Sequence, residues 1–417
     1  MGGIVMTGYP KKLWTKDYFF GIGVNLLVYI VHFLLMLWST SYAITRWHVD
    51  IGTAGLASGI FIVGALAARI PAGRYIDFIG RRKLFLAGTI LFFLLAHLYM
   101  AAPTLSLFMA VRFLHGISFG ITSTAVSTIV AALIPNSRMG TGIGYFTLGV
   151  TVASAIGPYA AIRFVHGGMF ESAMYFAIVV AAVILVLSIF MKVPERKVSQ
   201  REREELKHFA LSDFFARKSL AIAFVAMIGG ICYSTVLSFL GEYAGSLHLT
   251  IGGTWFFICF AFTSIFSRPA TGWLLDHKGG SIVIYPALVA LAISMLVIAF
   301  ARTDAALLMG GLILGIGYGT ITAACHALSI HCASARQIGV ATSTYFVLLD
   351  LGIGVGPYLL GNLVSTYGFS AVYICAAVFA IFGIGFYYLE LGRKSRFTPY
   401  RMEQDREMKL KEAMAHK

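Results

Sequence analysis

The sequence predicts an all-α membrane protein with twelve transmembrane helices, arranged as two six-helix bundles related as parallel repeats. Three observations support this prediction: sparse charge, twelve apolar segments of membrane-spanning length, and motifs that recur at one fixed distance. Of the 417 residues, 59% are hydrophobic and only 12% are charged, with a mean hydropathy of +0.83. Soluble domains carry about 25% charged residues, so this chain has too little polar surface to face water on every side.

Apolar runs follow one another along almost the whole chain. A helix needs about 20 apolar residues to cross a bilayer, and twelve runs reach this length. The runs lack the alternating pattern of an outer-membrane strand, so we expect helices. In order, they cover residues 18–44, 51–72, 83–102, 105–130, 139–163, 170–192, 218–244, 251–274, 281–300, 305–331, 337–362 and 369–391.

One long polar segment divides these runs into six plus six. Residues 193–217 contain mixed runs of Arg, Lys and Glu and predict a cytoplasmic linker. The first predicted bundle is therefore residues 1–192 and the second is 218–392. Residues 393–417 form a basic tail, predicted to be cytoplasmic.

The basic residues indicate the orientation in the membrane. Of the 32 Lys and Arg residues, about 26 lie in the two termini, the linker and the connectors on the same side. The opposite connectors hold Arg46, Arg163 and Arg302. Positive charge accumulates on the cytoplasmic side, so we expect both termini in the cytoplasm and a multi-pass protein of the cell membrane. The net charge of +14 therefore reflects topology, and we expect no nucleic-acid partner.

The two halves contain related motifs. Each motif of the first half recurs 199 positions later, which indicates a duplicated six-helix unit. Repeats of this kind are typical of secondary transporters, whose substrate site lies near the midplane between the repeats. The matching positions are Arg69 and Arg268, Asp77 and Asp276, Gly157 and Gly356, and Pro158 and Pro357.

A glycine- and arginine-rich stretch follows the second predicted helix. It contains the five residues Gly73, Asp77, Gly80, Arg81 and Arg82. The stretch resembles the loop signature of the major facilitator superfamily, although Phe78 stands where that family usually has a basic residue. The resemblance extends over about residues 15–392, and the second copy around Asp276 is degenerate. It implies a charge latch that holds one conformation of the halves; simple anchoring by positive charge is the alternative.

Two further motifs resemble those of twelve-helix drug–proton antiporters. Arg112, His115 and Gly116 resemble an R-x-x-Q-G motif, with histidine in the glutamine position. Arg112 lies about eight residues inside the outer end of its helix, so we expect Arg112 and His115 to serve coupling or substrate binding in the central region; snorkelling of Arg112 to the membrane interface is the alternative. The small residues and prolines of the fifth and eleventh helices partly match an exporter-associated motif and allow close packing and bending. Packing alone is the alternative role. These residues are Gly144, Gly157, Pro158, Gly352, Gly356 and Pro357.

Asp350 is the most informative acid. It lies about thirteen residues into the eleventh predicted helix, near mid-bilayer, where a carboxylate is costly and can bind a proton. A structural hydrogen bond at a helix interface is the alternative. Glu242, near the outer end of the seventh helix, is the second candidate. The first helix has no acid, unlike many drug–proton antiporters, and its polar residues are Asn25 and His32.

We therefore expect a secondary transporter that exports small organic molecules or drugs in exchange for protons by alternating access. The alternatives are a proton-coupled importer of a metabolite and, more remotely, a membrane sensor or enzyme. The five cysteines form no C-x-x-C pair, so we expect no metal site, and we expect no cofactor. The expected partners are a small-molecule substrate, protons and the lipid bilayer, and we expect a monomer.

Overall fold

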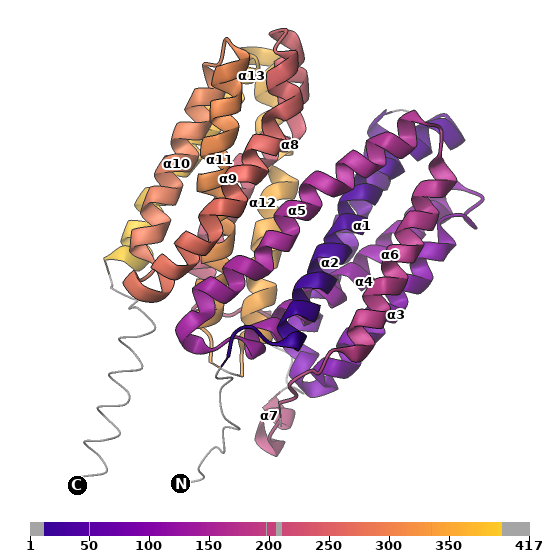
Figure 1. The fold of residues 1–417 in the computed structure, drawn as a ribbon, viewed down its shortest axis with the longest axis vertical. Helices are drawn as coiled ribbons and strands as arrows, with labels where there is room; N and C mark the ends of the chain where they lie inside the picture. The colour runs from indigo at the N-terminus through magenta and orange to yellow at the C-terminus, as the bar shows by residue number, and fades with distance from the viewer. Residues whose placement is uncertain (1–11, 50, 197, 206–210, 335, 394–417) are drawn as a thin grey trace.

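The computed structural model describes residues 12–49, 51–196, 198–205, 211–334 and 336–393, and this part of the chain is helical and contains no strand (Figure 1). A long helix stands at each of the twelve predicted runs. The long helices are α1 (Lys16–Trp47), α2 (Ile51–Ile79), α3 (Arg81–Leu98), α4 (Leu105–Leu133), α5 (Met139–His166), α6 (Phe170–Phe190), α8 (Leu220–Ser246), α9 (Thr250–Lys278), α10 (Ser281–Ala299), α11 (Asp304–His331), α12 (Ile338–Tyr367) and α13 (Phe369–Tyr387).

Four short helical segments complete the described part. They are η1 (Asn136–Arg138), α7 (Gln200–Glu205), η2 (Leu211–Phe214) and η3 (Tyr388–Gly392). The linker contains α7 and η2, which fits its predicted polar character. The predicted basic tail, apart from Arg393, lies outside the described residues.

Eleven of the long helices are long and apolar enough to cross a membrane. The remaining one, α3, begins with Arg81, Arg82 and Lys83, and these three charges lower its hydropathy. Large apolar side chains such as Phe190, Phe266 and Val378 are well exposed, as expected of a surface that faces lipid.

The second helix is longer than the sequence predicted. We expected it to end near residue 72 and a loop to hold Gly73, Asp77 and Gly80, but α2 continues to Ile79 and only Gly80 separates it from α3. Gly80 has a φ of +99°, which glycine adopts without strain. The prediction was wrong because hydropathy marks the segment within lipid, whereas a helix can continue past the membrane surface.

The helices form a first half (α1–α6) and a second half (α8–α13), which stand side by side in Figure 1. In the first half α2 packs against α4 and α1 against α5. In the second half α9 packs against α11 and α8 against α12, which are the same pairs shifted by one repeat. Contacts between the halves come mainly from α5 on α9 and α11, and from α12 on α2 and α4.

Glycines allow the helices within each half to approach closely. A side chain at Gly157 would lie 3.0 Å from the carbonyl oxygen of Ile30, so this position brings α5 onto α1. A side chain at Gly352 would overlap the carbonyl of Met227, and one at Gly356 the hydroxyl of Ser234, which brings α12 onto α8. Pro158 and Pro357 lie inside α5 and α12 one residue after these glycines.

The two halves meet at the end of the molecule where α7 lies. Figure 1 shows the groups of helices converging there and leaning apart toward the opposite end. At the converging end a side chain at Gly140 would lie 2.7 Å from the carbonyl oxygen of Gly272. A side chain at Gly73 would lie equally close to the carbonyl oxygen of Gly339. The backbones of α5 and α9, and of α2 and α12, are therefore in direct contact at this end.

Candidate functional site

An ion pair joins the two halves. Nε of Arg69, on α2, lies 3.0 Å from Oδ2 of Asp350, on α12. The Arg69 side chain is 1% exposed and that of Asp350 17%. Removing a charged side chain from water costs free energy, and a nearby opposite charge offsets that cost. Each of the two residues therefore favours the position of the other.

Aromatic rings surround this pair from both halves. The guanidinium carbon of Arg69 lies 4.5 Å from the ring centroid of Phe346 and 5.4 Å from that of Phe119. Tyr29 packs edge-on against Phe119, with 5.2 Å between ring centroids. The cation–π contacts stabilise Arg69 in a place where water is largely excluded.

A second polar contact crosses the same interface. Oγ of Ser127, on α4, lies 3.0 Å from Nε2 of His326, on α11. These two positions are also 199 residues apart, so they lie at matching places in the two repeats. The His326 ring stacks on Tyr345 and adjoins Phe346. We call Arg69, Asp350, Ser127 and His326 the central cluster.

Arg268, the repeat partner of Arg69, has a different environment. It lies on α9 and is only 4% exposed. Its Nη2 donates a long hydrogen bond, 3.4 Å, to Oγ1 of Thr322. No acceptor within the described part of the chain reaches its Nε or Nη1. The two repeats thus bury one paired and one unpaired arginine.

Arg112 and His115, both predicted site residues, lie inside the first half. Arg112 donates from Nη2 to the carbonyl oxygen of Ser58 at 2.9 Å, and from Nε to that of Ala57 at 3.3 Å. Its guanidinium group also lies over a ring of α2, that of Phe61, at 4.7 Å. Nδ1 of His115 lies 2.9 Å from the hydroxyl of Tyr99, which Arg112 also contacts. These contacts bind α4 to α2, and the structure does not bring them to Asp350.

The other predicted polar residues are dispersed. Nδ2 of Asn25 donates to the carbonyl oxygen of Phe146 at 3.1 Å and so links α1 to α5. His32 stacks on Phe119 at 4.8 Å, which places it one ring away from Arg69. Glu242 is exposed near the end of α8.

The motif around Asp77 contacts the linker. Oδ1 of Asp77 accepts from Nε of Arg81 at 2.6 Å, and Oδ2 pairs with Nη1 of Arg196 at 3.2 Å. The backbone N–H groups of Arg81 and Arg82 both donate to the carboxylate of Glu195 at 2.9 Å. This is the favourable placement of an acid at the N-terminus of α3.

The network continues to the second half through the linker. Arg196 also pairs with Glu202, at the start of α7, and Glu202 accepts from Nε of Arg336 at 2.7 Å. Arg336 follows α11 in the second half. The chain of charges from Asp77 through Arg196 and Glu202 to Arg336 therefore spans both halves, and we call it the linker network.

Asp276, the repeat partner of Asp77, contacts the N-terminus of a helix in the other half. Its Oδ1 accepts from the backbone N–H of Gly140 at 2.6 Å. Its Oδ2 accepts from the N–H and the hydroxyl of Thr141 at 2.9 and 2.6 Å. These donors are the unpaired N–H groups at the N-terminus of α5, where a negative charge is favoured. At Gly144, one turn later, a side chain would lie 3.2 Å from the carbonyl oxygen of Arg268.

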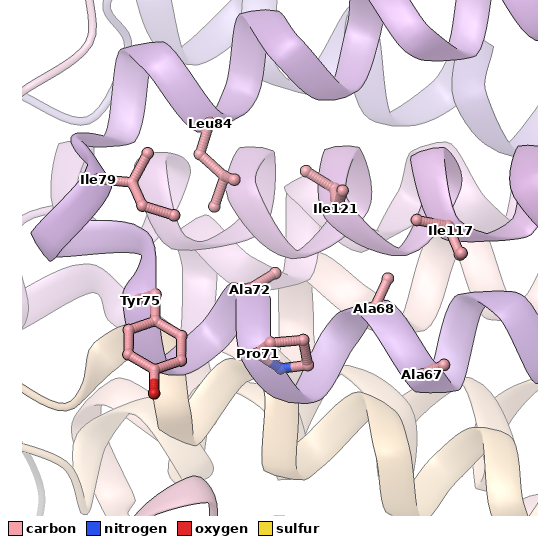
Figure 2. Close-up of a pocket in the computed structure, with 9 residues that line it drawn as sticks. All are labelled: Ala67, Ala68, Pro71, Ala72, Tyr75, Ile79, Leu84, Ile117 and Ile121. Atoms are coloured by element: carbon pink, nitrogen blue, oxygen red, sulfur yellow. The ribbon is translucent and has the colours of Figure 1, made fainter. Parts of the chain in front are cut away.

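An apolar pocket of about 300 Å³ lies elsewhere, between α2, α3 and α4 (Figure 2). It is lined by Ala67, Ala68, Pro71, Ala72, Tyr75, Ile79, Leu84, Ile117 and Ile121. All of these residues belong to the first half, and the lining holds no charged group. The central cluster, where charges from both halves meet, is therefore the candidate functional site.

Comparison with known proteins identifies the family. A model of the Major Facilitator Superfamily matches residues 19–304 and 253–413, which together cover most of the chain. The chain belongs to the Major Facilitator Superfamily. This confirms the resemblance seen in the glycine- and arginine-rich motif, and it makes the chain a member of a multi-pass membrane transporter family.

Individual members of the superfamily resemble the chain along most of its length. An uncharacterized MFS-type transporter of Methanocaldococcus jannaschii is 23% identical over 338 residues, which are 78% of this chain and 86% of that protein. Multidrug resistance protein MdtG of Escherichia fergusonii is 23% identical over 80% of this chain and 83% of its own. The crystal structure of the human organic anion transporter MFSD10 has the same fold, with a TM-score of 0.71 and 17% identity, covering 89% of this chain and 97% of that one.

Sequence reasoning missed both Arg69 and Arg268 as site residues. They were seen only as parts of a repeated motif. The signal was nevertheless present, because an arginine inside a membrane helix is costly and usually functional.

Proposed function

We propose that this protein is a proton-coupled exporter of small organic molecules that works by alternating access. Its twelve long helices cross the cell membrane as two bundles related by the repeat, with both termini in the cytoplasm, and the monomer is the working unit. The observation that supports the proposal is the ion pair between Arg69 and Asp350, because a carboxylate at the boundary of the two halves is a group that can bind the coupling proton.

Protonation of Asp350 would remove its negative charge and break this ion pair. Arg69 would then be a buried cation without a counter-charge, an arrangement that costs several kcal/mol in proteins. The halves would relieve that cost by moving apart at this level, which hydrates Arg69 or presents it to a substrate. A proton bound from one side therefore shifts the population between two arrangements of the halves.

The orientation follows from the charges. The linker network and the Asp276 contact close the converging end, which is the side that carries the excess of Lys and Arg. If that side is cytoplasmic, the arrangement described here is closed toward the cytoplasm. A reporter that works only in the cytoplasm should be active when it is fused after Lys417. A reporter that works only outside the cytoplasm should be inactive there, and the opposite result would reverse this topology.

Two features support export over import. The exporter-type motifs of α4 and α5 are one, and the similarity to a protein named multidrug resistance protein MdtG is the other. The same ion pair would serve an importer, so the direction has to be measured.

The decisive experiment is transport in proteoliposomes with an imposed pH gradient and a panel of labelled organic anions, cations and neutral compounds. For an exporter, substrate should move against the direction of proton flow. Asp350→Asn should abolish gradient-driven accumulation but preserve exchange of substrate down its own gradient. Glu171→Gln, which changes an exposed acid at the start of α6, is the matched control, and Glu242→Gln tests the second candidate acid. Movement of substrate with the protons would establish an importer, and full accumulation by Asp350→Asn would reject Asp350 as the coupling acid.

A further inference from the structure

Arg268 is a buried cation that the protein itself leaves without a counter-charge. It is 4% exposed, and its Nε and Nη1 find no acceptor in the part of the chain that the structure describes. Its one hydrogen bond, to the neutral hydroxyl of Thr322, is long. An isolated buried charge is strongly unfavourable, so such a group is retained where something else neutralises it.

The repeat shows what is missing. Arg69 is neutralised by Asp350, and the residue 199 positions before Asp350 is Thr151 on α5. Thr151 is buried. Its helix, α5, packs against α9, the helix that carries Arg268. The position that would hold the acid is therefore occupied by a residue that cannot carry a negative charge.

The surroundings of Arg268 are suited to an organic group. One turn earlier, the buried hydroxyl of Ser264 also has no partner among the described residues. Thr322, which Arg268 contacts, lies one turn after Tyr318 on α11, and its carbonyl oxygen accepts from the hydroxyl of Tyr345, on α12, at 2.8 Å. Tyr318 stacks on Tyr233 at 4.2 Å, and Phe260 stacks on Tyr233 at 5.5 Å. A guanidinium group with free donors beside flat aromatic rings matches a ligand with an anionic head and an apolar body.

We propose that Arg268 is the anion-binding residue of the substrate site, and that the substrates are organic anions with one carboxylate and an apolar or aromatic body. The carboxylate binds one edge of the guanidinium group as a bidentate pair, Nη2 together with either Nε or Nη1, and so takes the place of the long bond from Nη2 to Thr322. Ser264 supplies a further hydrogen bond. The apolar body packs on the rings of Tyr233, Phe260 and Tyr318. This proposal rests on the transport function proposed above and names its substrate class.

Binding to the purified full-length protein in detergent tests this assignment without a gradient. The probes are benzoate and octanoate, each compared with its neutral amide, benzamide and octanamide. The wild-type protein should bind each carboxylate at least about tenfold more tightly than its amide, because a charged hydrogen-bonded pair contributes about 1.5–3 kcal/mol. Equal affinity for acid and amide would overturn the proposal.

Substitutions assign the effect to Arg268. Arg268→Gln should remove the preference for carboxylate, whereas Arg302→Gln, which changes an exposed arginine, should retain it. If Arg268→Gln does not fold, Arg268→Lys serves, since it keeps the charge but loses the bidentate fork and should weaken the preference. Retention of the full preference by whichever variant folds would overturn the assignment.

The outcome is separable from that of the proposed function. Arg268→Gln could lose carboxylate binding while the wild-type protein shows no gradient-driven transport. That result would support the proposed anion site and reject the proposed proton coupling. Gradient-driven transport of cations alone, unaffected by Arg268→Gln, would keep proton coupling and reject the anion site.

Discussion

Oδ1 of Asp276 lies 2.6 Å from the backbone nitrogen of Gly140, across the boundary between the two halves. Asp77, its repeat partner, instead pairs with Arg81 and with Arg196 of the linker. The two copies of one motif therefore hold the converging end by different chemistry. One copy uses a carboxylate at a helix N-terminus, and the other uses arginine side chains.

The Asp276 contact should be the more important of the two for closure. Asp276→Asn keeps one acceptor oxygen but cannot accept from both Gly140 and Thr141 as a charged group. Hydrogen bonds to charged groups contribute about 1.5–3 kcal/mol, so amide hydrogen exchange at residues 140–141 should rise roughly 10- to 100-fold. Hydrogen exchange with mass spectrometry in detergent measures this. Asp304→Asn is the matched control, because its carboxylate accepts from the N–H of Gly252 at 2.6 Å within the second half, and it should leave these amides protected. Unchanged exchange in Asp276→Asn would contradict the prediction.

The ion pair between Arg69 and Asp350 should contribute to the stability of the folded protein as well as to transport. Asp350→Asn leaves Arg69 buried without its counter-charge, and removing one partner of a buried pair costs about 3–5 kcal/mol. We therefore expect a clear fall in the melting temperature, and partial recovery when Arg69→Gln is added.

A double-mutant cycle of thermal unfolding with Asp350→Asn and Arg69→Gln measures this coupling. The residues are in contact, so the effects should be far from additive. Additive effects would mean that the two side chains do not interact in the folded protein.

The sequence was sufficient to predict where the helices lie, but not which residues of different helices contact each other. Hydropathy located each of the long helices in the described part of the chain, because the membrane requires apolar segments of a fixed length. It missed the end of α2, where Arg74 and Asp77 extend the helix beyond the apolar run. Asp350 was identified from its depth alone. Its partner Arg69 lies 281 positions away, and only the docking of α2 on α12 brings the two together.

Arg112 differs from Asp350 because its contacts lie within the first half. Its depth in α4 led us to expect it in the central region, and that reasoning is sound for a lone membrane arginine. Whether the carbonyl oxygens of Ala57 and Ser58 can accept hydrogen bonds from Arg112 depends on how closely α2 and α4 pack. No feature of the sequence specifies those acceptors.

Substitution of Arg112 should therefore affect folding more than coupling. Arg112→Ala removes three hydrogen bonds and the contact with Phe61, and we expect a loss of about 3–5 kcal/mol, within the range for breaking a buried network. The amount of folded protein and its melting temperature should fall. The number of protons moved per substrate in the remaining folded protein should stay unchanged. An altered proton stoichiometry would place Arg112 in the coupling machinery after all.

The linker network should depend on pH through Glu202. Burial would raise the pKa of Glu202, but the N–H of Ser199 and the guanidinium groups of Arg196 and Arg336 outweigh it and hold the pKa below its ordinary value of 4.5. A lowered pKa means that the folded linker favours the ionised form. Its contribution to stability is thus fully present above pH 4.5 and is lost as the pH falls below that value.

We accordingly expect α7 to stay attached between pH 7 and 5 and to detach only in stronger acid. Hydrogen exchange at residues 200–205, measured from pH 7 down to well below pH 4.5, reports the attachment. Glu202→Gln should expose these amides already at pH 7 and make their protection independent of the ionisation of this residue, after correction for the intrinsic pH dependence of exchange. Glu204→Gln, two residues away and exposed, should behave as the wild type. A wild-type midpoint above pH 4.5, or full protection in Glu202→Gln, would show that this carboxylate does not hold the linker.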